Sequence, residues 1–358
     1  MDAKGTFVIS TETLPTEVAP WTRSKKQLRT PGMPKDFLRR LLQFAGRSMT
    51  EGAMQRISGP SAAEQLVERV LERVNAQGSP AVANLEGILA QTRQLESHLA
   101  HTRHLSALAF EDRLLEDQLG RFGPLFVAKR NTHMFSQTYE DAAIAEIFSR
   151  IGTTSKTFIE IGVEDGSENT TRLLLMLGWR GLWIEGSSAH CATIRDGFAD
   201  DLASGKLQLI NAMAAPDTIQ SLVDTSGFGP QIDFLSIDVD QHTSHLYRAI
   251  TTRSRVACLE YNAHLPPSID YEVPYHPNEV WDGSNCFGAS LKRLEIDAAQ
   301  KGMSLVGCDL MGVNAYFVDH TLTGDLFPKP FTAEHHYQPP RYGFIRGSRG
   351  HRRKAARL

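Results

Sequence analysis

Five short apolar runs alternate with helical patterns through the middle of this 358-residue chain. The apolar runs lie at 157–161, 181–185, 207–212, 232–237 and 256–261, and amphipathic stretches lie between them at 167–178, 188–204, 216–224 and 243–251. Strands joined by crossover helices form right-handed βαβ units, which build a parallel sheet with helices on both faces. The alternation therefore predicts an α/β fold around a mostly parallel sheet.

The end of this pattern distinguishes two kinds of α/β sheet. After a predicted helix at 289–301 come two apolar runs, 304–308 and 313–318, which only Asp309–Gly312 separates. This connection is too short for a crossover, so the two runs should form an antiparallel hairpin at the sheet edge. Five parallel strands and a terminal hairpin are the strand plan of the class I methyltransferase fold. A NAD-binding Rossmann domain would need a sixth parallel strand instead.

The segment Thr157–Asn169 (TFIEIGVEDGSEN) has the residues of a nucleoside-binding turn. Its strand ends on Glu160, and Gly162 and Gly166 follow, where small residues allow a ligand to approach the backbone. The next strand ends on Glu185, an acid that can accept hydrogen bonds from both ribose hydroxyls. The glycine spacing is not that of G-x-G-x-x-G and is more typical of S-adenosylmethionine (SAM) sites. We expect the cofactor to contact Glu160, Gly162, Gly166, Asn169, Glu185, Ala212 and Asp238.

Oxygen-bearing side chains follow the fourth and fifth strands, which are neighbours in this fold. Asp238 and Asp240 follow the fourth strand, and Glu260 and Asn262 follow the fifth. Such oxygens are the ligands that Mg²⁺ or Mn²⁺ prefers, and a metal there would bind the acceptor hydroxyl and lower its pKa. The alternative is that Glu260 and Asn262 only organise loops and that Asp238 alone faces the ligand.

Two histidines and a long loop follow the strands where we expect the molecule that accepts the methyl group of SAM. A hydroxyl group is a poor nucleophile, so a base near it helps methyl transfer. His242 and His264 are candidates beside Asp238, although either could have an ordinary structural role. The loop at 271–288 is long for a compact domain and mixes aromatic rings with hydrogen-bonding groups, as sugar sites do, unless it is a structural Ω-loop around its tryptophan. We expect acceptor contacts from Tyr275, Trp281, Asp282 and Asn285.

The linked motifs of the middle region run from Ser136-Gln137-x-x-Glu140-Asp141 through FIEIGVEDGSENTT, GWRGLWIEG, FLSIDVDQ, CLEYNAHLPP and VWDGSNCFGASL to LVGCDLMGVNAYFV. Together they resemble a bacterial group of SAM-dependent methyltransferases related to the FkbM-type O-methyltransferases. The resemblance covers about 135–318. It implies a class I fold, SAM as cofactor, and O-methylation of a hydroxyl, commonly on a sugar.

The resemblance also bears on the acids after the fourth and fifth strands. Metal-dependent relatives have an acid after strand four and an acid/amide pair after strand five, which Asp238, Glu260 and Asn262 match. Many relatives carry glycine and asparagine where this chain has Gln241 and His242, so its acceptor pocket and base should differ. Alternative functions are methylation of a non-sugar natural product, or a non-catalytic SAM-fold scaffold that acts through its N-terminal helices.

Outside the predicted methyltransferase domain at 131–330, the sequence predicts three regions: a polar N-terminal arm at 1–52, a helical region at 53–130 and a basic tail at 331–358. Leucines recur along the helical region at intervals of three, four, six and seven, which indicates one apolar stripe. The stripe should either pack against the domain or associate with a second copy, and we expect a homo-oligomer. The tail should be solvated or contact an anionic partner.

Composition excludes other classes of protein. A net charge of −3 does not indicate specific nucleic-acid binding, and no run of 18 apolar residues predicts a membrane span. The N-terminus lacks the basic start and apolar run of a signal peptide. The four cysteines form no C-x-x-C pair and should be reduced thiols, so we expect a cytoplasmic protein.

Overall fold

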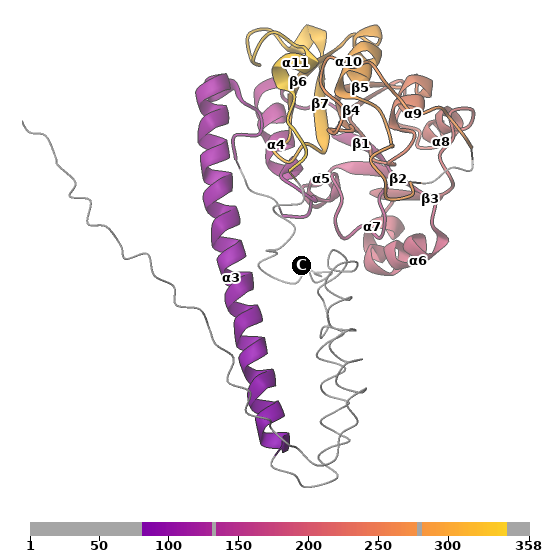
Figure 1. The fold of residues 1–358 in the computed structure, drawn as a ribbon. Coiled ribbons are helices and arrows are strands. Elements are labelled where there is room, and N and C mark those ends of the chain that lie inside the picture. The colour runs from indigo at the N-terminus through magenta and orange to yellow at the C-terminus, as the bar shows by residue number, and fades with distance from the viewer. Residues whose placement is uncertain (1–80, 131–133, 278–280, 342–358) are drawn as a thin grey trace, which may run out of the picture. The chain divides into compact units, whose positions relative to one another are not determined.

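The computed structural model describes residues 81–130, 134–277 and 281–341 (Figure 1). The chain divides into two units, Met1–Arg93 and Gln94–Leu358, and the sheet lies in the second unit. The predicted arm at 1–52, the helical region before residue 81 and residues 342–358 of the basic tail lie outside the described residues.

Seven strands form one sheet in the order β3-β2-β1-β4-β5-β7-β6. Their bounds are β1 Thr157–Ile161, β2 Arg180–Glu185, β3 Leu207–Asn211, β4 Gln231–Ile237, β5 Arg253–Glu260, β6 Met303–Cys308 and β7 Asn314–Asp319. The first five strands pair in parallel, and β7 pairs antiparallel with both β5 and β6. This is the class I methyltransferase fold, and the predicted terminal hairpin is confirmed. The strand order reverses between β1 and β4, where open α/β sheets bind their ligands.

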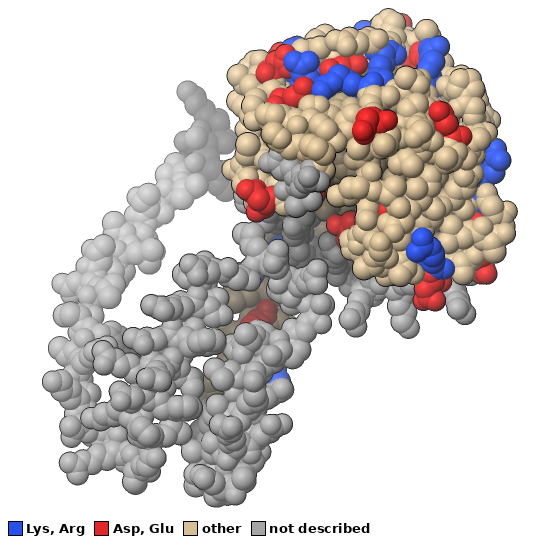
Figure 2. Space-filling model, turned by 90° about the vertical axis from the view of Figure 1, so that its right-hand side faces the viewer, with Lys and Arg blue, Asp and Glu red and all other residues tan. Residues whose placement is uncertain are grey.

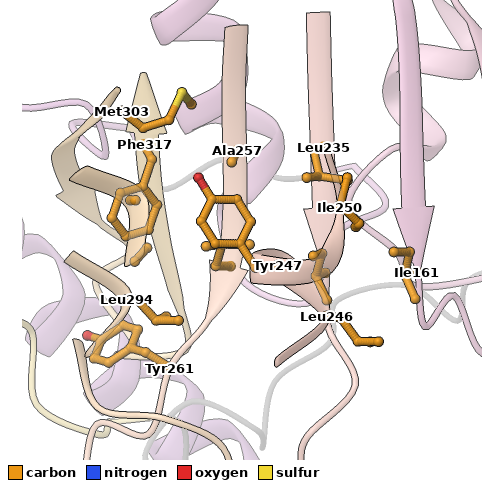
Figure 3. Packing of buried hydrophobic residues seen from close by; sticks show 14 of the residues in the cluster. Ile161, Leu235, Leu246, Tyr247, Ile250, Ala257, Tyr261, Leu294, Met303 and Phe317 are labelled. Carbon is orange, nitrogen blue, oxygen red and sulfur yellow. The ribbon is translucent and has the colours of Figure 1, made fainter. Parts of the chain in front are cut away.

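Helices cover both faces of the sheet because alternate strand residues point to opposite faces and nearly all of them are apolar. On one face Ile159 and Leu235 pack with Leu246 of α9, and Figure 3 shows part of this cluster. On the other face Phe158 and Phe234 belong to a second cluster. The helices around the sheet are α4 Glu140–Ile151, α5 Arg172–Met176, α6 Ser188–Gly197, α7 Ala199–Ala203, α8 Ile219–Asp224, α9 Thr243–Ala249, α10 Leu291–Gln300 and α11 Ala333–His336.

The helix α3, Ala81–Phe122, contains the leucines of the predicted apolar stripe, but its apolar side chains are spread around the helix and do not form one stripe. Near its C-terminal end Leu114 and Phe122 are buried in a cluster with Phe126 and Met311. Leucines before this end are exposed, at 61% for Leu95 and above 40% for the others, which are Leu99, Leu105 and Leu108. The C-terminal end of α3 therefore packs against the domain, and self-association through the exposed leucines stays a prediction.

The domain extends past the predicted boundary at residue 330. Tyr261 Oη donates a hydrogen bond to the carbonyl oxygen of Gln338 (2.7 Å), and Arg341 donates one to the carbonyl oxygen of Leu310 (2.8 Å). Residues 331–341, which we predicted to begin the basic tail, thus belong to the packed domain. None of the described helices combines the length and apolarity that a membrane span needs. The four cysteines form no disulfide.

Candidate functional site

A cavity of about 970 Å³ lies at the carboxyl ends of β1, β2, β4 and β5. The turns after these strands line it, together with part of the 281–287 loop and the turn between β6 and β7. Most predicted site residues line this one cavity: Glu160, Gly162, Asn169, Glu185, Ala212, Asp238, Asp240, His242, Glu260, His264, Trp281 and Asn285. Four do not: Gly166, Asn262, Tyr275 and Asp282.

The predicted cofactor acid Glu160 organises the segment that follows it. Its carboxylate accepts hydrogen bonds from Asn169 Nδ2 (2.6 Å), from Thr171 Oγ1 (2.5 Å) and from the backbone N–H groups of Thr170 and Thr171. Burial raises the pKa of this carboxyl, and the four donors oppose the increase. Asn169 Oδ1 is buried without a hydrogen-bond partner. Because Asn169 also lines the cavity, its oxygen can accept a hydrogen bond from a ligand.

Gly162 allows the turn after β1 to approach β4. Its φ is +80°, and a Cβ at this position would lie 1.8 Å from the backbone oxygen of Asp238, so no other residue fits. Gly166 also has a positive φ of +74°, but a Cβ there would meet the rings of Phe198 (2.9 Å) and Trp183 (3.1 Å). Our prediction that Gly166 contacts the cofactor is not supported, because its small size serves packing beneath the turn.

Glu185, at the end of β2, holds the same turn from the other side. One carboxylate oxygen accepts hydrogen bonds from the N–H groups of Val163 (3.2 Å) and Glu164 (2.9 Å), and the other accepts from Ser187 N–H (2.7 Å). Glu185 therefore fixes the turn that borders the cavity and also lines the cavity itself. Its place at the end of the second strand is the one that the sequence predicts for a ribose-binding acid.

Three acids lie together where β4 and β5 end. Glu260 Oε2 accepts a hydrogen bond from the backbone N–H of Asp240 (3.0 Å), and Asp240 has a positive φ of +56°. Burial and the negative charge of Asp240 raise the pKa of Asp238 to about 7. Burial and the charges of Asp238 and Asp240 raise the pKa of Glu260 well above its usual value. We call Asp238, Asp240 and Glu260 the acidic trio.

The fourth predicted metal ligand, Asn262, points away from the trio. Its amide nitrogen donates hydrogen bonds to the carbonyl oxygens of Asn285 and Phe287 (both 2.9 Å), and its Oδ1 accepts one from His264 N–H (3.0 Å). Asn262 thus organises the 285–287 loop, which was our alternative reading. Among the residues that the structure describes, no group of three or more His, Cys, Asp or Glu side chains is arranged to hold a metal ion. The predicted four-oxygen set does not fit a metal in this arrangement.

The two candidate bases have different surroundings. His242 is buried, and its ring lies edge-on to that of Tyr275 at 4.9 Å between centroids. Tyr275 therefore supports His242 and does not face the cavity, contrary to our prediction of an acceptor contact. His264 is exposed and lines the cavity. Asp282 accepts a hydrogen bond from Ser284 N–H within its own exposed turn, so it organises the loop and does not line the cavity.

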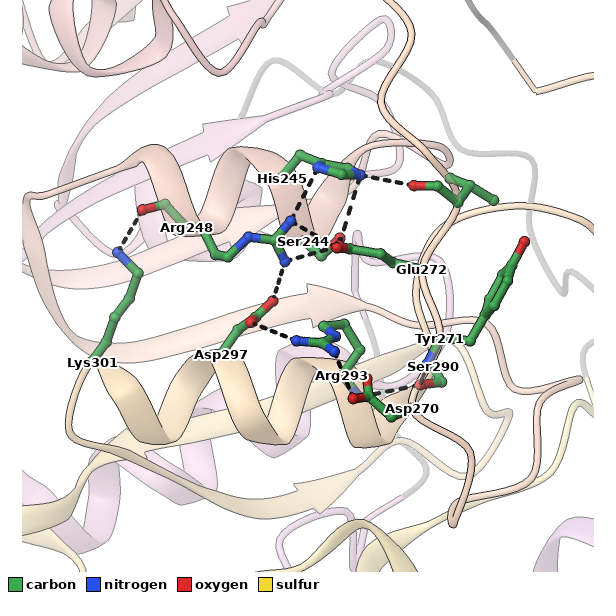
Figure 4. A network of polar contacts seen from close by, with 11 residues as sticks. Ser244, His245, Arg248, Asp270, Tyr271, Glu272, Ser290, Arg293, Asp297 and Lys301 are labelled. Atoms are coloured by element: carbon green, nitrogen blue, oxygen red, sulfur yellow. Dashed lines mark hydrogen bonds and ion pairs between the residues drawn. The ribbon is translucent and has the colours of Figure 1, made fainter.

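A network of ion pairs anchors the start of the 271–288 loop (Figure 4). Arg248 of α9 contacts Glu272 of the loop (2.8 Å) and Asp297 of α10 (2.6 Å). His245 hydrogen-bonds through Nε2 to the carbonyl oxygen of Val273 (2.8 Å). Arg248 thereby fixes one end of the loop, and Asn262 fixes the other.

Several cavity residues were absent from our sequence-based prediction, and two of them lie close to the acidic trio. Glu140 at the start of α4 is buried and accepts a hydrogen bond from Asn314 Nδ2 (2.9 Å), and its charge helps to raise the pKa of Asp238. Gln241 is buried beside the acidic trio, and its Oε1 has no hydrogen-bond partner. Glu140 belongs to the S-Q-x-x-E-D motif, which is a sequence signal for this position. The sequence distinguishes Gln241 only as a departure from related sequences.

No protein-family model matches this chain, and no curated protein matches its sequence significantly. Solved structures with a similar arrangement include the N-terminal domain of EvdMO1 with SAH bound (TM-score 0.35, 14% identity, 51% of this chain and 80% of that one). A second is the glycopeptide N-methyltransferase MtfA with SAH (TM-score 0.32, 15% identity, 54% of this chain and 95% of that one). A third is a SAM-dependent methyltransferase from Clostridium acetobutylicum (TM-score 0.31, 10% identity, 49% of this chain and 88% of that one). Scores of this size add nothing to the fold that the strand order already shows.

Proposed function

We propose that this chain is a SAM-dependent methyltransferase that methylates a hydroxyl group of a saccharide or glycosylated compound. The observation that carries the proposal is one cavity at the strand reversal, with the glycine turn after β1 on one side and the acidic trio on the other. A nucleoside-type cofactor and an acceptor can bind side by side in a cavity of this volume. The antiparallel β7 favours SAM over NAD as the cofactor.

In the cofactor half, Glu185 would accept hydrogen bonds from the ribose hydroxyls while it continues to hold the turn after β1. Asn169 Oδ1 would accept a hydrogen bond from the ammonium group of SAM, and Glu160 would orient Asn169 through its Nδ2. Ala212 lines the same cavity after β3, next to the expected adenine. These residues bind and orient, and SAM supplies an electrophilic methyl group when it is bound.

In the acceptor half, the protein has to align a hydroxyl oxygen with the methyl group and receive its proton. Alignment of bound reactants supplies much of the rate enhancement in such transfers. Of the two histidines, His264 is exposed in the cavity, so we assign it the role of base, with Asp238 near the acceptor. Metal assistance is not part of the proposal, because the side chain of Asn262 hydrogen-bonds to the carbonyl oxygens of Asn285 and Phe287 in the loop.

Calorimetry with SAM and with NAD⁺ tests this function. We expect SAM and its demethylated product, S-adenosylhomocysteine (SAH), to bind and NAD⁺ to give no heat. Tight NAD⁺ binding together with no response to SAM would end the methyltransferase proposal. The acceptor class is then tested by mass spectrometry of glycans from cells with and without the protein, where a glycan that gains one methyl group only in the presence of the protein is the expected result.

A further inference from the structure

The charges that line the cavity are strongly unbalanced. Among the described residues, eight carboxylates line it and no Lys or Arg does; the acids are Glu140, Glu160, Glu164, Glu168, Glu185, Asp238, Asp240 and Glu260. Figure 2 shows that Lys and Arg side chains do lie on the outer surface of the domain, beside acidic ones. A cavity lined by one sign of charge attracts ligands of the opposite sign and repels those of the same sign.

Protein groups already engage three of these acids. Glu160 accepts four hydrogen bonds, Glu185 accepts three, and Glu140 accepts from Thr138 N–H and Asn314 Nδ2. The acidic trio has fewer donors from the rest of the protein: Glu260 accepts one hydrogen bond, from the backbone N–H of Asp240, and Asp238 and Glu260 hydrogen-bond to each other. None of the ion pairs found between described residues includes any of its three carboxylates. Carboxylates crowded in this way require a cation or must bind protons.

A second observation concerns hydrogen-bond acceptors. Gln241 is only 5% exposed, lines the cavity next to Asp240, and its Oε1 has no partner. A buried acceptor without a donor costs about 1–3 kcal/mol, so a ligand that brings a donor to this point gains affinity. The carboxylates and this amide oxygen are all hydrogen-bond acceptors, so they favour a ligand rich in N–H groups.

We propose that the acceptor carries a basic amine, as an amino sugar does, and that its ammonium group binds between Asp240 and Gln241 beside the hydroxyl that receives the methyl group. This inference rests on the proposed function and names its substrate class. An ammonium group supplies both the positive charge that the trio lacks and three N–H donors. Acceptors that carry phosphate or carboxylate groups are excluded by repulsion. A divalent cation would need a convergent set of ligands, which Asn262 does not complete.

The test uses the full chain saturated with SAH, with binding followed by ligand-observed NMR. The probes are D-glucosamine, N-acetyl-D-glucosamine and D-glucose 6-phosphate, which differ mainly in charge. We expect D-glucosamine to bind at least about tenfold more tightly than the other two, the size of one charge-assisted hydrogen bond. Asp240→Asn and Gln241→Leu should each weaken D-glucosamine binding, the first by about tenfold. Asp325→Asn removes a fully exposed acid and should leave binding unchanged.

Three outcomes would overturn the inference: D-glucose 6-phosphate binds as well as D-glucosamine, D-glucosamine does not bind, or Asp240→Asn leaves its affinity unchanged. Tighter Asp240-dependent binding of Mg²⁺ alone would also overturn it and would assign the trio to a metal. SAH binding is measured first in the same samples. If SAH does not bind, the proposed function fails, whereas normal SAH binding with no preference for the amine contradicts only the inference about the acceptor.

Discussion

Glu260 accepts a hydrogen bond from the backbone N–H of Asp240, so a carboxylate joins the ends of β4 and β5 at the cavity. This contact keeps Asp238, Asp240 and Glu260 close together although burial and the negative charges of neighbouring acids raise the pKa of each of them. Such an arrangement costs stability in the absence of a ligand. Strain of this kind is expected where a protein binds a cation or handles a proton.

Asp238→Asn should raise stability and abolish methyl transfer. The folded-state pKa of Asp238 is about 7 against an ordinary value of 3.8. Between these values the folded state retains a proton that the unfolded state has lost, so the free energy of unfolding falls as pH rises, by at most about 1.4 kcal/mol per pH unit, and levels off above about pH 7. Urea unfolding of both proteins across this range measures the slope. An equal slope in the variant, or near-normal turnover, contradicts the assignment.

Gly162→Ala should cost far more than Gly178→Ala, although both glycines have positive φ. At Gly178 (φ +87°) a Cβ meets nothing within 4 Å, so alanine should cost about 1 kcal/mol from backbone strain alone. At Gly162 the overlap with Asp238 O is added, and we expect a loss of about 3 kcal/mol or more together with loss of SAM binding. Thermal unfolding and SAM calorimetry on the pair check this. Equal losses would mean that the turn relaxes and does not need its close approach to β4.

The sequence predicted the sheet well because strand signals are local. No knowledge of tertiary contacts is needed to identify the apolar runs, the acids at their ends or the short link between β6 and β7. Gly166 and Asn262 were misjudged because their roles depend on partners distant in sequence, namely the Phe198 ring and the carbonyl oxygens of the loop at 285–287. Tyr275 was misjudged for the same reason, since a loop side chain takes its direction from packing and not from local pattern.

Methyl transfer should survive treatment with EDTA. The metal prediction needed an oxygen from Asn262, and that side chain uses its amide group to hold the loop and His264. Activity before and after chelation, with Mg²⁺ or Mn²⁺ added back, gives the answer. Loss of activity that either metal restores would mean that Asn262 releases the loop and joins Asp238 and Glu260 as a ligand.

Acid should destabilise the region around α11. Burial lowers the pKa of His336 to about 3, and its ring stacks on Phe122 of α3. Because the folded state holds this histidine neutral, its contribution to the free energy of unfolding is complete above the pKa of an unfolded histidine, near 6.5. This contribution is lost as pH falls toward 3. His336→Phe should keep the stacking and flatten this part of the stability curve. His98→Gln removes an exposed histidine of α3 and should leave the curve unchanged. A wild-type slope in His336→Phe would refute the assignment.

Arg248→Met should weaken acceptor binding more than SAM binding. Arg248 ties Glu272 of the 271–288 loop to Asp297, whose side chain is only 1% exposed. Loss of the guanidinium leaves Asp297 buried without its closest cation, and we expect about 2–4 kcal/mol of destabilisation. Arg248→Met combined with Asp297→Asn removes the buried charge and should restore much of the stability, but not the anchor of the loop. The double variant should therefore fold and bind SAM normally while KM for the acceptor stays raised. Recovery of a normal acceptor KM in the double variant would show that the ion pair stabilises the fold and does not position the loop.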